Sequence, residues 1–161
     1  MEIIIKSKKF GERVILIDNN DFDKIKYYSL SLFKDKDRLY VRTSWINGKR
    51  YLLHRYLTNA PDDKQVDHIN HNTLDNRVST NLRLCTHSEN MRNSLKHKKS
   101  IRSSYKGVAT NNNSIYAFIT INKVQKRLGS YKTHKDAAAA YNEAAVKHFG
   151  QFACLNIIDW N

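Results

Sequence analysis

The amino-acid sequence predicts an α+β protein, and three observations support this fold class. Short β-branched runs separated by turn residues fill the first part of the chain. In the middle, two strand-like runs flank a polar loop and precede a helix with a clear start signal. Near the end, three strand-like runs precede one alanine-rich helix. We therefore expect a β-rich N-terminal portion, a central strand–strand–helix core, and a C-terminal three-stranded antiparallel sheet packed on one helix.

Residues 1–60 are expected to form the β-rich portion that leads into the core. Its predicted strands cover residues 1–6, 13–18, 27–34 and 38–44. The pair Asn47-Gly48 is a strong signal for a hairpin turn, because both residues tolerate a positive φ. Residues 51–59 then favour a helix with one apolar stripe, which Pro61 closes.

Residues 61–95 are expected to form the central core. Residues 65–69 and 81–85 predict two strands, and an Asn- and Asp-rich loop joins them. Thr86 and Glu89 have the spacing of a capping box, in which each side chain satisfies a free amide at the start of a helix. A helix over residues 87–95 should follow.

A basic connector, residues 96–104, leads to a C-terminal domain, residues 105–161. Small and branched apolar residues alternate with others along 115–122, which predicts a strand with one buried face. Thr133 and Asp136 form a second capping pair. The alanine-rich residues 137–149 then predict a helix that ends at Gly150.

The charge balance points to an anionic partner. The 161-residue chain has a formal net charge of +13 and a pI near 9.8, as nucleic-acid-binding proteins do. A protein that binds other anionic surfaces without specificity would have the same excess of positive charge. Charge alone therefore does not distinguish nucleic-acid binding from such non-specific binding. The excess lies in residues 1–60 and 96–161, whereas 61–95 are nearly neutral. Basic flanks around a neutral centre fit phosphate binding around a cation site.

Cysteine usage and hydropathy indicate an intracellular protein. Cys85 and Cys154 are far apart and belong to no Cys-x-x-Cys pair, so we expect neither a zinc ribbon nor a disulfide framework. The apolar runs are too short for a membrane span, and residues 1–10 lack the features of a signal peptide. We therefore expect a location in the cytoplasm of a bacterial or phage-infected cell.

The candidate chemistry begins with Asp67 and His68, at the end of the first predicted strand of the core. Phosphodiester hydrolysis requires a base for the water, a cation on the phosphate and charge relief at the leaving oxygen. Asp67 offers an oxygen ligand suited to Mg²⁺, and His68 suits general-base catalysis. The pair alone is weak evidence, but Asn81 opens the second predicted strand and Asn90 lies on the capped helix.

The segments VDHIN, LDNR, NLRL and THSEN follow one another in this order. Together they resemble the HNH nuclease family, whose ββα-metal core is a hairpin and a helix around one cation. The resemblance implies that His68 is the general base. It implies that Asn81 braces the loop and orients the backbone of His68. It further implies that Asn90 is a metal ligand alongside Asp67.

Two features depart from the common family pattern. Asn90 stands where many members have His, as in the branch that resembles phage intron-encoded homing endonucleases. An Asp and Asn oxygen pair favours Mg²⁺ or Mn²⁺ over zinc, with one ion in the site. In addition, three residues, 78–80, separate DNR from NLR, where two are usual.

Three further side chains are weaker candidates. His87 precedes Asn90 by one helical turn and either contacts the leaving group or a phosphate, or is an exposed histidine at a helix start. His54-Arg55 matches a His-Arg pair that commonly precedes this core in the family. Either Arg55 holds a phosphate and His54 supports the core, or both are packing residues. The remaining polar loop residues are interpreted as loop-shaping: His71, Asn72, Asp75, Asn76 and Arg77.

The C-terminal domain resembles the APETALA2-type domain of plant ethylene-response transcription factors. That type of domain also occurs C-terminal to HNH nuclease domains. The matching segments are YKGV from Tyr105, LGSY from Leu128, DAAAAYNEAA from Asp136, FGQFA from Phe149, and Leu155-Asn156. The resemblance implies that the exposed face of the sheet enters the major groove. Tyr116, Phe118 and Thr120 stand where the family usually has arginines. These side chains are expected either to contact thymine methyl groups or sugars of the DNA, or to form a surface that binds another partner.

Double-stranded DNA is the expected partner, bound by a monomer without a small-molecule cofactor. The basic connector is either a passive linker or follows the DNA backbone. The predicted DNA contacts are Arg55, Lys96, Lys98, Lys99, Arg102, Lys106, Asn111, Tyr116, Phe118, Thr120, Gln125 and Arg127. Two alternatives to a site-recognising homing-type endonuclease remain: a non-catalytic DNA-binding regulator with a decayed core, and a non-specific nuclease.

Overall fold

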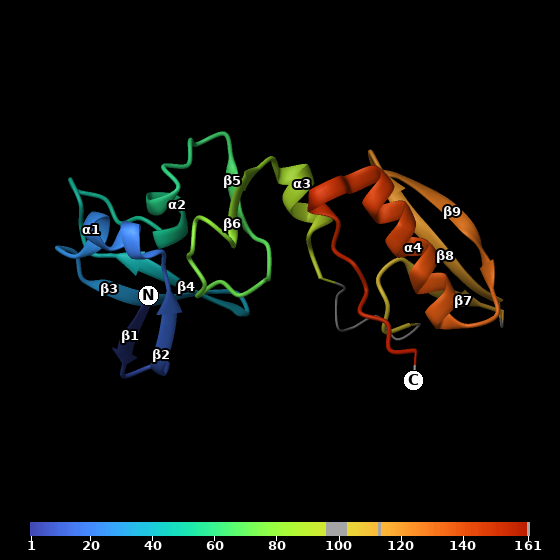
Figure 1. Ribbon diagram of the computed structural model, residues 1–161, viewed down its shortest axis with the longest axis horizontal. Coiled ribbons are helices and arrows are strands. Elements are labelled where there is room, and N and C mark those ends of the chain that lie inside the picture. The colour runs from blue at the N-terminus through green and yellow to red at the C-terminus, as the bar shows by residue number, and fades with distance from the viewer. Residues whose placement is uncertain (96–102, 113, 161) are drawn as a thin grey trace. The chain divides into compact units, whose positions relative to one another are not determined.

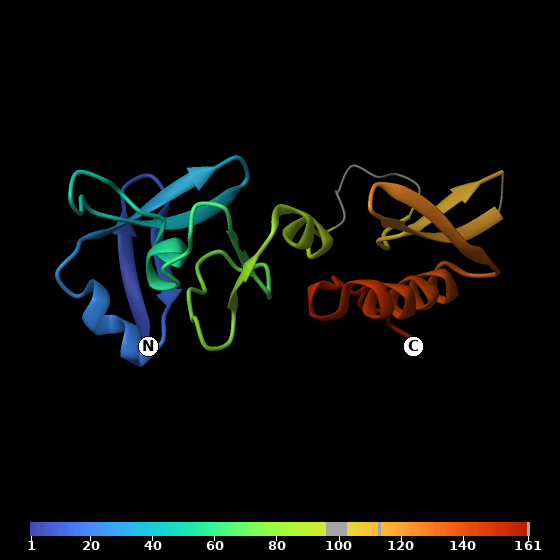
Figure 2. The same cartoon turned by 90° about the horizontal axis from the view of Figure 1, so that it is seen from above.

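The computed structural model describes residues 1–95, 103–112 and 114–160. The chain divides into two compact units, Met1–Asn90 and Met91–Asn161 (Figures 1 and 2). Each unit combines small antiparallel sheets with helices, which confirms the mixed α and β content that the sequence predicts.

Unit 1 holds three two-stranded antiparallel sheets among the described residues. They pair β1 (Glu2–Ser7) with β2 (Gly11–Leu16), β3 (Leu30–Asp35) with β4 (Arg38–Thr43), and β5 (Gln65–His68) with β6 (Leu82–Cys85). The helical elements are η1 (Asn19–Asp21), α1 (Phe22–Ile25) and α2 (Leu53–Leu57), and α3 (His87–Arg92) follows β6.

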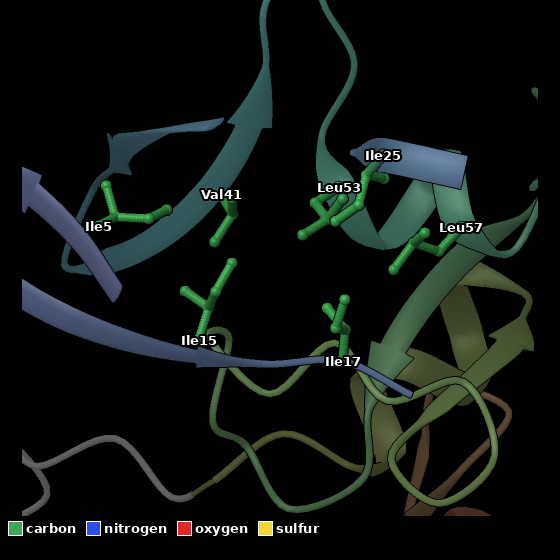
Figure 3. Close-up of a cluster of buried hydrophobic side chains, with 7 residues drawn as sticks. All are labelled: Ile5, Ile15, Ile17, Ile25, Val41, Leu53 and Leu57. Atoms are coloured by element: carbon green, nitrogen blue, oxygen red, sulfur yellow. The ribbon is translucent and has the colours of Figure 1, made fainter. Parts of the chain in front are cut away.

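One apolar core joins the N-terminal strands to the central segment. Seven side chains from β1, β2, α1, β4, α2 and the segment after β2 point toward one another (Figure 3): Ile5, Ile15, Ile17, Ile25, Val41, Leu53 and Leu57. Leu74 and Val78, from the loop between β5 and β6, pack against this cluster. Burial of branched side chains contributes about 1.5–3 kcal/mol each. The β-rich N-terminal portion and the central core therefore share one hydrophobic interior.

Main-chain bonds strengthen this connection. The amide of Leu16 donates to the carbonyl of Leu74 at 3.0 Å, and the amide of Asn76 donates back to Leu16 at 2.7 Å. The end of β2 thus fixes one edge of the loop between β5 and β6.

The structure corrects one sequence prediction in unit 1, the start of β3, and confirms another, the turn at Asn47-Gly48. A strand over residues 27–34 was expected, but β3 begins only at Leu30. The reason is the short helix α1, because the amide of Tyr28 still donates to the carbonyl of Ile25. The Asn47-Gly48 turn is confirmed: both residues have positive φ, at 48° and 74°.

Unit 2 contains a three-stranded antiparallel sheet and one long helix. The strands β7 (Val108–Asn111), β8 (Ser114–Ile121) and β9 (Val124–Tyr131) lie in chain order. Helix α4 (His134–Phe149) lies along one face of this sheet in both views, and η2 (Gly150–Phe152) follows it. The oxygen of Thr133 accepts from the amide of Asp136, so the second cap is confirmed, and α4 begins three residues before the predicted start.

Small residues and two asparagines explain the sequence signature of unit 2. Gly107 has φ 71°, and a Cβ there would lie 1.9 Å from the ring of Tyr141, so only glycine fits. Asn156 bonds both main-chain groups of Lys106, at 2.6 and 3.0 Å, and exchanges two further bonds with Asn142. The final segment is thereby tied to α4 and to the start of the sheet.

Within the described residues, no helix combines the length and apolar character needed to cross a membrane.

Candidate functional site

The loop between β5 and β6 is built from side chains that bond the main chain. Asn70 accepts from the amide of Asn72, and Asn72 accepts from that of Leu74, as Asx turns do. Arg77 donates to Asp75 through Nε at 2.8 Å and Nη2 at 2.6 Å. This contact is the main reason that the pKa of Asp75 lies below its ordinary value. The expectation of a loop shaped by its polar residues is confirmed for Asn72, Asp75 and Arg77.

Asn81 closes this loop beneath the end of β5. Its Oδ1 accepts from the amide of Asn70 at 2.9 Å, and its Nδ2 donates to the carbonyl of Asp75 at 2.7 Å. Its own carbonyl accepts from the amide of Ile69, the residue after His68. The side chain is almost fully buried. Asn81 therefore fixes the main chain next to His68, the position in which a bracing residue is expected.

We expect Asn81→Ala to destabilise unit 1 by about 3 kcal/mol, because it leaves two main-chain groups without their partners. Asn72→Ala removes one exposed bond from the same loop, and we expect it to cost less than about 1 kcal/mol. Urea unfolding of the full chain, with hydrogen exchange of peptides from residues 69–81, measures both. Equal losses in the two variants would contradict the bracing role of Asn81.

The additional loop residue is anchored rather than loose. Asp18, which follows β2, accepts from the amide of Ser79 at 2.8 Å and from its hydroxyl at 2.6 Å. The three-residue spacer therefore has a partner of its own in the N-terminal portion, and Asn81 keeps its contacts.

Asp67 lies in β5 opposite Arg83 in β6. Arg83 donates to one carboxylate oxygen, Oδ2, through Nε at 2.9 Å and Nη2 at 2.6 Å. The exposed fractions of the two side chains are 6% for Asp67 and 12% for Arg83. A buried carboxylate needs such a partner, because an isolated charge in a protein interior is strongly unfavourable.

His68 lies among aromatic rings from other elements. The centroid of its ring is 5.0 Å from that of His54 in α2, edge to face, and 6.3 Å from that of Tyr40 in β4. Burial lowers the pKa of His68 to about 4 and that of His54 to about 3. Both imidazoles are therefore neutral at neutral pH, the state in which a histidine can accept a proton.

Asn90 is positioned by the start of α3. The capping box is confirmed: the amide of Glu89 donates to Thr86, and the amide of Thr86 donates to the Glu89 carboxylate at 2.7 Å. One helical turn further, Nδ2 of Asn90 donates to Oε1 of Gln65 in β5 at 2.7 Å. The side-chain nitrogen of Gln65, Nε2, also forms a hydrogen bond with Nδ1 of His87 at 3.2 Å. Gln65 thus holds α3 against β5 and leaves Oδ1 as the atom of Asn90 that can meet a cation.

These side chains meet at one pocket of about 160 Å³ in unit 1. It is lined by Phe33, Asp35, Arg38, Tyr40, Leu52, His54, Val66, Asp67, His68 and Asn90. Three of the predicted site residues, Asp67, His68 and Asn90, therefore share one cavity. His87 is exposed and does not line it.

The comparisons with known proteins agree with this arrangement. A family model described as HNH endonuclease matches residues 58–92, the segment that carries these residues. An uncharacterized HNH endonuclease of Acanthamoeba polyphaga mimivirus is 36% identical over 143 residues, which cover 78% of this chain and 73% of that protein. The chain belongs to the HNH endonuclease family. No solved structure matches it. The resemblance of the core is thus confirmed, and the chain is a nuclease whose family acts on DNA and generally uses a divalent metal.

The donor set of this HNH endonuclease fits a magnesium-type ion. No cluster of three or more His, Cys, Asp and Glu side chains occurs in the described ranges. Mg²⁺, however, usually takes only one or two protein carboxylates, with water and substrate phosphate completing its shell. A carboxylate from Asp67 and an amide oxygen from Asn90 are hard ligands of this kind.

Arg55 is placed differently from the expected phosphate contact. Its guanidinium donates to the carbonyls of Lys64 at 2.7 Å, Pro61 at 2.9 Å and Ala60 at 3.2 Å. These three bonds use most of its donors. Arg55 thereby supports the chain between α2 and β5 and is not directed at a phosphate.

The exposed face of the sheet in unit 2 carries most of the other predicted contacts. A groove of about 500 Å³ is lined by Asn111, Ser114, Tyr116, Phe118, Gln125 and Arg127. The guanidinium of Arg127 lies 4.7 Å from the ring centroid of Tyr116 and donates to Ser130 at 2.8 Å. Thr120 is exposed on β8, next to Gln125 across the pair.

Lys106 does not belong to that face. Its ammonium donates to the carbonyls of Arg92 at 2.7 Å and Ser94 at 2.5 Å, and burial lowers its pKa below the ordinary value. The expected base or phosphate contact of Lys106 is therefore replaced by a structural one. The other basic predictions, Lys96, Lys98, Lys99 and Arg102, lie outside the described residues.

Sequence reasoning missed several residues that line the pocket or hold its side chains in place. Arg83 could have been found, because it is part of the NLRL segment and its register places it opposite Asp67. Gln65 offers no comparable signal, since its role depends on the distance between β5 and α3. Arg38 and Tyr40 reach the pocket only through the folding of the β3–β4 hairpin onto the HNH core.

Proposed function

We propose that this HNH endonuclease is a homing-type enzyme that cuts or nicks duplex DNA near a recognised site. His68 acts as general base, and Asp67 with Asn90 holds one Mg²⁺ or Mn²⁺. The observation that supports the proposal most directly is the meeting of these three side chains at one pocket, next to a loop that Asn81 braces. An acceptor for a proton and two hard oxygen ligands are what phosphodiester hydrolysis needs.

His68 accepts the proton of the attacking water in this proposal. Its neutral form is maintained by burial, and its ring packs against the rings of His54 and Tyr40, which also contact each other. The fixed turn at Ile69 and Asn70 limits main-chain movement, so the imidazole keeps its direction.

Asp67 and Asn90 supply oxygen ligands to one pocket from two elements, β5 and α3. When a divalent ion is bound there, it withdraws charge from the phosphate oxygens. Arg83 holds the Asp67 carboxylate in place through two bonds to Oδ2, and the bond from Nδ2 of Asn90 to Gln65 leaves the amide oxygen of Asn90 for the ion.

Unit 2 supplies the DNA-recognition surface in this proposal, as an APETALA2-type domain. A three-stranded sheet with α4 on one face leaves the other face for a groove of the duplex. Tyr116 and Phe118 form an aromatic pair, with ring centroids 6.1 Å apart, and Arg127 is fixed beside them. Apolar rings suit the methyl groups of thymine, and a fixed guanidinium suits guanine or phosphate.

We expect Arg127→Ala to lower the affinity for the preferred DNA about tenfold, the effect of losing one base or phosphate contact. Lys126→Ala is the matched control. Lys126 also carries one positive charge on β9, but it pairs with Ile119, whose side chain faces the helix. The measurement is fluorescence anisotropy with a sequence selected from a random library by the full chain, in Ca²⁺ to prevent cutting. Equal losses of affinity in both variants would mean that Arg127 contributes only its positive charge and makes no specific contact with the DNA.

A plasmid assay tests the proposal as a whole. Supercoiled DNA incubated with the full chain should be nicked or linearised in Mg²⁺ or Mn²⁺ and stay intact in EDTA. Footprinting on the same DNA should show a protected sequence. Protection without cutting would favour a DNA-binding regulator, and cutting without any protected sequence would favour a non-specific nuclease.

A further inference from the structure

The cleavage pocket has a wall that does not come from the HNH core. Four of its lining residues, Phe33, Asp35, Arg38 and Tyr40, belong to the β3–β4 hairpin. In the register of that hairpin Phe33 pairs with Tyr40, and Asp35 pairs with Arg38 beside the turn. One aromatic cross-strand pair and one oppositely charged cross-strand pair therefore line the same cavity.

Arg38 is the one arginine of unit 1 that is not already used by the fold, and every residue of this unit is described. Its side chain is exposed and makes no hydrogen bond, ion pair or ring contact with the described residues. The other six arginines of unit 1 each contact a carboxylate, a carbonyl or an aromatic ring: Arg13, Arg42, Arg50, Arg55, Arg77 and Arg83.

Arg38 borders the proposed catalytic groups. It lines the same cavity as Asp67, His68 and Asn90. Among the described residues that line this cavity, it is also the only lysine or arginine.

We infer that Arg38 is a substrate-binding residue that contacts the DNA phosphate in the cleavage pocket. The inference rests on the proposed nuclease function of Asp67, His68 and Asn90. A guanidinium presents parallel N–H donors that match two phosphate oxygens, and its charge does not depend on pH. In hydrolysis the phosphate oxygens gain negative charge in the transition state, so such a donor stabilises that state more than the bound substrate. The N-terminal hairpin thus supplies the cationic part of an active site whose base and metal ligands come from the core.

The test is single-turnover cleavage by the full chain with Mg²⁺ and excess protein. Arg38→Gln should lower the cleavage rate about 100-fold, as the loss of one donor to a developing oxyanion does. Arg38→Lys, which keeps the charge without the planar fork, should lose less. Methylguanidinium added to Arg38→Ala should restore part of the rate. Arg50→Gln is the matched control, since Arg50 lies over Trp45 and outside the pocket, and it should cut at the wild-type rate.

DNA binding gives a second, independent measurement. In Ca²⁺, Arg38→Gln should reduce the slope of log affinity against log salt by about one, the value for one lost phosphate contact. Failure of the wild-type chain to cut in Mg²⁺ would overturn the proposed function itself. Cutting by the wild type and by Arg38→Gln at equal rates, with equal salt slopes, would overturn the inference about Arg38 alone. A loss in Arg38→Gln that neither lysine nor methylguanidinium restores would assign Arg38 to the support of the hairpin and also overturn it.

Discussion

His68→Ala should strongly slow cutting while DNA binding and folding persist. A general base contributes about 10²–10⁴-fold to a hydrolysis rate, and the side chain has no substitute of equal basicity in the pocket, because His54 is the more deeply buried imidazole. We expect the rate in Mg²⁺ to fall within this range. Single-turnover cleavage of plasmid DNA measures the rate, and anisotropy in Ca²⁺ measures the binding.

The control for His68→Ala is His148→Ala, which removes an exposed imidazole from α4 in unit 2. It should leave the cleavage rate unchanged. Thermal unfolding should place both variants within a few degrees of the wild type, with the larger decrease in His68→Ala, because alanine lacks the aromatic contacts of the His68 ring. A His68→Ala variant that cuts at the wild-type rate would refute the assignment of the base.

Local signals in the sequence predicted much of the core. Thr86 and Glu89 are three residues apart and cap a helix wherever they occur at its start, so Asn90 could be placed on α3 without any tertiary information. The Asn-rich loop likewise bonds mainly to itself, which makes its role visible from composition. These parts of the site depend on contacts between residues that are close in the chain.

The remaining parts depend on contacts between distant residues. Asp18 and Ser79 bond across 61 positions, and nothing in either local sequence indicates the other. Arg55 looked like a phosphate contact because its family position and its charge permit one, but three nearby carbonyls take its donors. Lys106 was likewise assigned to an exposed face, although the start of unit 2 buries its stem. For Arg55 and Lys106, charge alone did not reveal that main-chain carbonyls accept their hydrogen bonds.

Asp67→Asn should have two separable effects, on metal binding and on folding. The carboxamide is a weaker ligand for Mg²⁺, so we expect cutting at millimolar Mg²⁺ to fall by at least about 100-fold. The substitution also leaves Arg83 nearly buried without its counter-charge, and removal of one partner from a buried ion pair costs about 3–5 kcal/mol. Mn²⁺ binding followed by electron paramagnetic resonance measures the first effect, and urea unfolding measures the second.

The double variant Asp67→Asn, Arg83→Met distinguishes these effects, because it removes the unpaired charge while Met fills much of the volume of the arginine stem. Stability should return to within about 1–2 kcal/mol of the wild type, since replacing both partners of a buried pair with groups of similar shape is often close to neutral. Cutting and Mn²⁺ binding should stay lost. If the double variant regained both stability and cleavage, Asp67 would be a structural anchor for Arg83 and the ion would have to be held elsewhere. If it regained stability alone, the carboxylate serves the metal, and Arg83 holds that carboxylate in position through its two hydrogen bonds.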